Sequence, residues 1–105
     1  MGSLLYGGVL VDFDDRLLAH LQIVIVQKLR RGEGFLMSWR DAAEGANGYS
    51  AIWLHPAQHL FFKFDGLWDG TLNEDWIDQL NLAANSSRGL LIMEEGSRAE
   101  LPTES

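Results

Sequence analysis

The chain is 105 residues long, contains no cysteine and carries a formal net charge of −7, with 47% hydrophobic and 22% charged residues. This composition excludes a disordered chain, and the lack of cysteine excludes a disulfide framework and thiolate metal sites. A chain of this length has room for one domain. We expect a single α+β domain over residues 1–93, followed by an acidic, disordered tail over residues 94–105.

The chain shows no sign of a membrane segment or an export signal. No apolar run approaches the roughly 18 residues that a membrane span needs. Residues 1–6 lack the basic start of a signal peptide. The sequence therefore predicts a cytoplasmic protein without membrane contact. Its negative charge also disfavours binding to a nucleic-acid backbone, which requires a basic surface.

The first elements in chain order are two strands and a long helix. A Gly-Gly pair at residues 7–8 separates the apolar segments 4–6 and 9–13, which predicts a hairpin. Asp14 stands in position to cap a helix over residues 15–31. Apolar residues recur at helical spacing along this segment, so the helix should bury one stripe.

The second half of the chain contains four strands and a second helix. Aromatic and β-branched residues predict strands over residues 35–40, 49–54, 60–64 and 90–93. The second helix is expected over residues 72–85, with Thr71 and Asn73 as competing caps. Residues 55–59 should form a hairpin turn between the second and third of these strands. The order β-β-α-β-β-β-α-β predicts an α+β fold with two helices packed on one face of a mostly antiparallel sheet.

Alternation along the predicted strands places Tyr49, Trp53, Phe61 and Lys63 on the sheet face that the helices do not cover. Loops or the terminal strands could cover this face. An uncovered aromatic face could bury itself in a protein partner or in a second copy of the chain. It could also stack the bases of a single-stranded nucleic acid. Of these partners, the acidic charge favours protein over nucleic acid.

Residues 63–66 read Lys-Phe-Asp-Gly, which matches the K-x-D-G nucleophile motif of ATP-dependent DNA ligases. In those enzymes the lysine amine attacks the α-phosphate of ATP. The motif makes Lys63 and Asp65 catalytic candidates, and ATP and magnesium are the cofactors under this alternative alone. The opposing interpretation is a strand that ends in an Asp-Gly turn, with Lys63 in solvent. A chain this short has little room for a nucleotide pocket and metal-binding acids.

Several stretches together resemble a family of small bacterial proteins of about this length. The resemblance rests on residues 18–22, 28–33, 35–39, 52–56, 63–64 and 84–90. Members are uncharacterised and are often labelled ATP-dependent DNA ligase. We interpret this label as a misannotation, because the small proteins resemble no complete ligase. The resemblance implies no catalytic residue.

Two further groups of polar residues could form sites. Lys28, Arg30 and Arg31 end the first helix and are candidate phosphate contacts, although such residues usually face solvent at a helix end. His55 and His59 flank a predicted turn without a nearby acid, so we expect no metal site. The leading hypothesis is a non-catalytic protein-interaction or regulatory module, with a homodimer as one form of that interaction. The alternatives are a nucleotidyl transferase that uses Lys63 and a single-stranded nucleic-acid binder.

Overall fold

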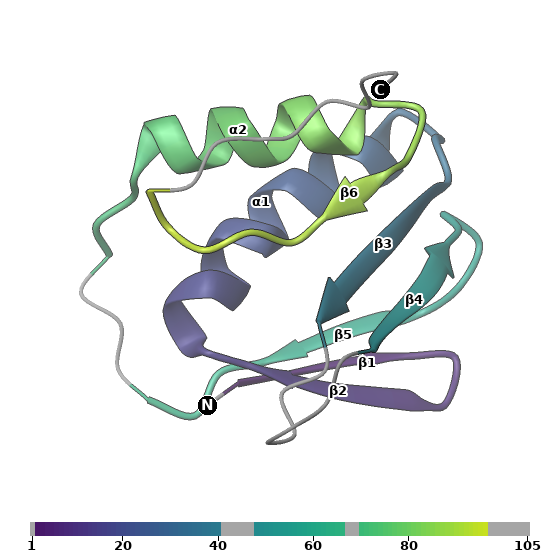
Figure 1. Cartoon of the computed structure of the whole chain (residues 1–105). Coiled ribbons are helices and arrows are strands. Elements are labelled where there is room, and N and C mark those ends of the chain that lie inside the picture. The colour runs from purple at the N-terminus through teal and green to yellow at the C-terminus, as the bar shows by residue number, and fades with distance from the viewer. Residues whose placement is uncertain (1, 41–47, 67–69, 97–105) are drawn as a thin grey trace.

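The computed structural model describes residues 2–40, 48–66 and 70–96 (Figure 1). The elements are β1 (Gly2–Tyr6), β2 (Val9–Phe13), α1 (Asp15–Arg30), β3 (Phe35–Arg40), β4 (Tyr49–Leu54), β5 (Leu60–Lys63), α2 (Glu74–Ala84) and β6 (Leu90–Leu91). This order confirms the predicted α+β fold. Residues 97–105, which include most of the expected tail, lie outside the described part of the chain.

The strands form two three-stranded sheets rather than one continuous sheet. One sheet has the order β2-β1-β5 and the other has the order β4-β3-β6. All pairings are antiparallel except that of β3 with β6, which is parallel. Both helices lie above β1, β2 and β5 in the view of Figure 1. Two sheets leave two outer faces, so the exposed strand residues need not share one surface.

The predicted hairpin between β4 and β5 is wrong. β4 pairs with β3, whereas β5 pairs with β1, so the segment between them crosses from one sheet to the other. The backbone N–H of Gln58 donates to the carbonyl of His55, which makes the turn that redirects the chain. At the start of this turn the backbone N–H of His55 donates to the Tyr6 hydroxyl at 2.7 Å. The last residue of β1 therefore helps to fix the crossing.

Both helix starts follow from local side-chain chemistry. The carboxylate of Asp14 accepts from the backbone N–H groups of Arg16 and Leu17, as predicted for the cap of α1. Asn73 rather than Thr71 caps α2, and its side-chain oxygen accepts from the N–H of Trp76. The hydroxyl and carbonyl oxygens of Thr71 instead accept from the Arg16 guanidinium. Thr71 thus joins the start of α1 to the segment that precedes α2.

One core lies between the helices and the inner faces of the two sheets. The helices contribute Leu18, Leu21, Val24, Ile25, Trp76, Ile77 and Leu80 to it, and the strands contribute Leu4, Phe13, Phe35, Met37, Leu54 and Leu90. All of these side chains are buried. Because α1 packs against both α2 and β1, it joins the second helix to the β2-β1-β5 sheet.

Gly89 permits β6 to enter the second sheet. Its φ of +83° lies in the left-handed region, where a side chain is disfavoured. A Cβ atom at this position would also lie 2.5 Å from the carbonyl oxygen of Leu36. The chain can therefore turn out of α2 and run directly beside β3 only if this residue is glycine.

Candidate functional site: the outer face of the β2-β1-β5 sheet

The outer face of the β2-β1-β5 sheet carries two rows of side chains. Leu5 lies opposite Leu10 on one side and Phe61 on the other, and we call these three residues the apolar row. Ser3 precedes Leu5 by two residues on β1. It lies opposite Asp12 on β2 and Lys63 on β5, and we call these three residues the polar row. Residues two apart on a strand point to the same face, so the two rows are adjacent on one surface.

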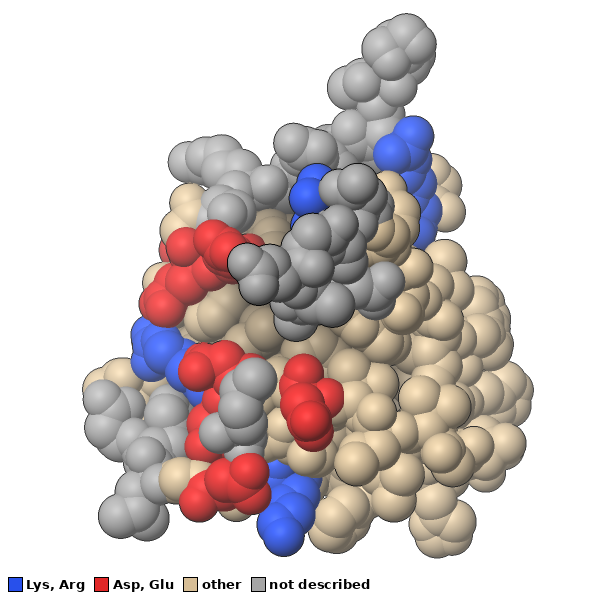
Figure 2. All heavy atoms as spheres, turned by 60° about the horizontal axis from the view of Figure 1, so that its bottom comes forward, with Lys and Arg blue, Asp and Glu red and all other residues tan. Residues whose placement is uncertain are grey.

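The apolar row is open to solvent across the whole width of the sheet. Leu10 is 63% exposed, Phe61 56% and Leu5 39%. The face that comes forward in Figure 2 holds a broad uncharged area on the right, and the acidic side chains gather on the left. Basic side chains lie at the left, at the bottom and at the upper right. The inner face of the same strands, by contrast, contributes the buried Leu4 to the core. This sheet is thus apolar on both faces over part of its length.

The four residues predicted to share an aromatic face are all exposed, but they lie on two different sheets. Phe61 and Lys63 belong to the β2-β1-β5 sheet, whereas Tyr49 and Trp53 belong to β4 of the other sheet. The expectation that their strands are neighbours is therefore wrong. The reason is the crossing at His55, which separates β4 from β5.

Two members of the apolar row, Leu5 and Leu10, were missed in the sequence. A signal for them was present, because a two-residue turn fixes the register of a hairpin. With Gly7 and Gly8 at the turn, Tyr6 lies opposite Val9 and Leu5 lies opposite Leu10. Leu4 points into the core, so the next residue on the strand, Leu5, points outward. Leu10 lies directly opposite Leu5 and therefore points outward as well.

The K-x-D-G segment is held to the first helix by its backbone. The two carboxylate oxygens of Asp15 accept from the N–H groups of Asp65 and Gly66, at 3.3 Å and 2.8 Å. The side chains of Lys63 and Asp65 are both exposed. Lys63 belongs to the polar row and does not line the cleft described next. The Asp65 and Gly66 amides therefore anchor this segment to the first turn of α1.

A cleft of about 400 Å³ lies between the C-terminal ends of both helices and the second sheet. Its lining residues are Lys28, Gly34, Phe35, Leu36, Trp53 and residues 84–89. Four of the stretches that carry the resemblance, residues 28–33, 35–39, 52–56 and 84–90, therefore contribute to this lining. The first two are neighbours in the sequence, and the fold brings the other two beside them.

Lys28 and Arg88 are the charged residues that line this cleft, and the Lys28 ammonium contacts two polar partners. Its Nζ atom donates to the side-chain oxygen of Asn85 at 2.9 Å and forms an ion pair with Glu33 at 3.0 Å. It also lies 5.7 Å from the centre of the Phe35 ring. The hydrogen bond from Lys28 holds the pKa of Glu33 below its ordinary value.

The three predicted phosphate contacts do not form one basic cluster. Arg31 lies 4.0 Å from the Glu33 carboxylate that pairs with Lys28, so an acid stands between these two cations. Arg30 is exposed on the helix surface. An anion at Lys28 would have to compete with Glu33. The geometry thus gives Lys28 a structural role at the junction of the two helices.

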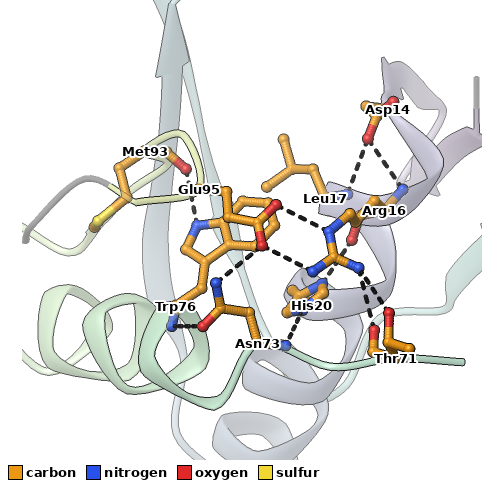
Figure 3. Close-up of polar contacts among 9 residues, drawn as sticks. All are labelled: Asp14, Arg16, Leu17, His20, Thr71, Asn73, Trp76, Met93 and Glu95. Atoms are coloured by element: carbon orange, nitrogen blue, oxygen red, sulfur yellow. Dashed lines mark hydrogen bonds and ion pairs between the residues drawn. The ribbon is translucent and has the colours of Figure 1, made fainter.

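A polar network ties the segment after β6 to both helix starts (Figure 3). The Arg16 guanidinium donates to both carboxylate oxygens of Glu95, at 2.9 Å and 2.8 Å, and the Asn73 amide donates to the second oxygen. The hydrogen bonds from Arg16 and Asn73 lower the pKa of Glu95 to about 2. Contacts to the folded domain thus continue two residues beyond the expected boundary at residue 93.

His20 lies at the centre of this network and is completely buried. Its Nδ1 atom faces the carbonyl oxygen of Arg16 at 2.7 Å, and its Nε2 atom accepts from the backbone N–H of Asn73 at 3.0 Å. The imidazole that carries its proton on Nδ1 satisfies both contacts. Its ring also packs on Trp76, with 4.6 Å between the ring centres. His20 therefore connects the two helices.

The described residues hold neither a cluster of metal ligands nor a membrane span. Within residues 2–40, 48–66 and 70–96, no three His, Cys, Asp or Glu side chains are arranged to hold a metal ion. The Nδ1 atom of His55 accepts from the N–H of Ala57 inside its own turn. Neither helix is long and apolar enough to cross a bilayer, as judged over those same residues.

Comparison with known proteins identifies a family. No curated protein and no solved structure matches the chain. A family model described as "Domain of unknown function (DUF7882)" matches residues 1–95, which span every helix and strand described above. The matched region ends at Glu95, the residue that Arg16 and Asn73 hold against the helices. The chain therefore belongs to the DUF7882 family.

Proposed function

We propose that this chain is a non-catalytic protein-interaction module and that its binding surface is the outer face of the β2-β1-β5 sheet. The observation that carries the proposal is the apolar row, which runs unbroken over all three strands. Isolated exposed apolar residues are common on monomers, whereas a contiguous exposed apolar patch is a candidate interaction surface. The flanking polar row provides the charged rim that such surfaces have.

The environment of Lys63 supports a non-catalytic role. A lysine becomes a nucleophile when it is desolvated or placed beside other cations. Lys63 is exposed, and its neighbour across β1 in the polar row is the carboxylate-bearing Asp12. The Asp65 and Gly66 amides, which complete the K-x-D-G motif, are bound to Asp15.

The charge distribution supports a protein partner over a nucleic acid. A single-strand binder needs a basic groove beside its aromatic platforms. The chain carries a net charge of −7, and the apolar row has one lysine beside it. Lys28, which lines the same cleft as the exposed Trp53, is paired with Glu33.

Site-specific photo-crosslinking in the host cell tests the proposal. A photoreactive phenylalanine analogue replaces Phe61 in the apolar row, and a matched control carries it at Leu82, which is 46% exposed on α2. We expect a defined product at position 61, identified by mass spectrometry as this chain bound to one protein, and none at position 82. The product should disappear when Leu5 and Leu10 are both changed to Asp. Equal products at both positions, or none at position 61, would overturn the proposal.

A further inference from the structure

We propose that the partner on this face is a second copy of the chain, docked face to face about a two-fold axis that runs parallel to β1. This inference rests on the proposed function and specifies its partner. The two rows are self-complementary under this one symmetry operation, both in their strand register and in the charges of the polar row.

The order of residues across the sheet provides the complementarity. β1 is the central strand, with β2 on one side and β5 on the other. A two-fold axis along β1 places β2 of one copy over β5 of the partner. Asp12 then faces Lys63 of the other copy, and Lys63 faces Asp12. In the apolar row, Leu10 faces Phe61 and Leu5 faces its own counterpart.

Asp12 is oriented for such a contact. The hydroxyl of Ser3 donates to its carboxylate at 2.8 Å, which restrains an exposed side chain within the polar row. Within one copy, Asp12 and Lys63 are separated by β1, a distance of about 9–10 Å between strand axes. Among the described residues no ion pair joins these two side chains, and the second copy brings the opposite charge over each of them.

Other symmetric arrangements fit this face less well. The alternative is a two-fold axis that runs perpendicular to the strands, midway between the two rows. This axis would place the polar row of one copy on the apolar row of the other. That arrangement would desolvate Asp12 and Lys63 against leucine and phenylalanine, which is costly. Aligned sheets pack with their strands within about 30° of each other, and the axis along β1 allows this geometry.

The size of the face sets the expected strength of the dimer. Three strands of five residues or fewer present a surface of about 14 Å by 17 Å. The area of this face is well below the roughly 800 Å² that each partner buries in a stable complex. We therefore expect weak, reversible association, with a dissociation constant in the micromolar range or above. An overall charge of −7 on each copy also opposes association, which makes the local pairing of Asp12 with Lys63 more important.

Charge reversal in the full chain provides a sharp test. The purified variants Asp12→Lys and Lys63→Asp each create like charges at both contacts of the dimer, and each should weaken association at least about tenfold. The double variant should restore it. An equimolar mixture of the two single variants should also associate, because the introduced lysine of one then meets the introduced aspartate of the other. Asp78→Lys, an exposed charge reversal on α2, serves as the control and should leave association unchanged.

Sedimentation velocity over a range of concentrations measures these equilibria. Recovery in the mixture is the decisive result, because contacts within one chain cannot produce it. If the single variants associate as the wild type does, or if neither the double variant nor the mixture recovers, the inference is overturned and another surface, such as the edge of β2, forms the contact. A chain that stays monomeric but crosslinks to a different protein through position 61 also overturns the inference, and it leaves the proposed function standing.

Discussion

The Nζ atom of Lys28 donates a hydrogen bond to the side-chain oxygen of Asn85, and this contact of 2.9 Å joins the C-terminal ends of the two helices. Both helix ends carry the negative pole of a helix dipole, which favours a cation between them. Lys28 is 8% exposed, and it reaches Glu33 as well. A lysine in the last turn of α1 thereby organises the cleft that faces Trp53 and residues 84–89.

Replacing this lysine by an apolar residue of similar length should destabilise the fold. We expect Lys28→Met to lower the free energy of unfolding by about 1–3 kcal/mol, because the hydrogen bond to Asn85 and the ion pair with Glu33 are both lost. Arg30→Met removes a charge of the same sign from an exposed position two residues away and should change stability by less than about 0.5 kcal/mol. Urea unfolding of both variants checks this. Equal effects would contradict the assigned role of Lys28.

A second prediction separates steric contact from backbone strain at glycine. Gly89 and Gly32 both have positive φ, of +83° and +77°. A Cβ on Gly89 would meet the carbonyl oxygen of Leu36, whereas a Cβ on Gly32 would meet nothing within 4 Å. Gly32→Ala should therefore cost about 1 kcal/mol from its backbone alone, and Gly89→Ala should cost clearly more. Thermal unfolding of both variants gives the comparison, and equal melting temperatures would show that β6 can move away from β3.

The third prediction concerns acid stability through Glu95. Its folded pKa of about 2 lies below its ordinary value of 4.5, so the contacts with Arg16 and Asn73 stabilise the fold above about pH 4.5. That contribution should be lost as the pH falls from 4.5 towards 2. Glu95→Gln should therefore be less stable than the wild type at neutral pH, and the difference should shrink over this acidic range. Unfolding measured in urea at several pH values follows the difference.

Glu94→Gln is the matched control for this experiment. It removes the same charge from the neighbouring exposed residue, and it leaves the hydrogen bonds of Arg16 to Glu95 intact. We expect its stability to follow that of the wild type between neutral pH and about pH 3. A difference between Glu95→Gln and the wild type that stays constant with pH would contradict the role of the carboxylate.

Local signals were sufficient to predict most elements but not their pairing. The Gly-Gly turn, the Asp14 cap and the stripe of α1 each depend on residues close in sequence, and the structure confirms them. The partner of β5 is β1, more than fifty residues away, and no local pattern in residues 60–64 encodes that choice. The position of Lys28 beside Asn85 likewise depends on how the helices pack. The exposed aromatic residues were therefore found, but they were assigned to one surface instead of two.

The last prediction asks which exposed aromatic residue lies in an interface. Trp53 is 57% exposed on β4, whereas Trp76 is 4% exposed in the core, where its indole N–H donates to the carbonyl of Met93. Trp76→Ala should cost about 3–5 kcal/mol of folding stability, and Trp53→Ala about 1–2 kcal/mol, because less apolar area is removed from contact. If the β2-β1-β5 face forms the dimer, Trp53→Ala should leave the association constant unchanged, while Phe61→Ala should weaken it about tenfold or more. Urea melts and sedimentation on the same samples separate folding from association. Association that weakens in Trp53→Ala but not in Phe61→Ala would move the interface to the sheet that contains β4.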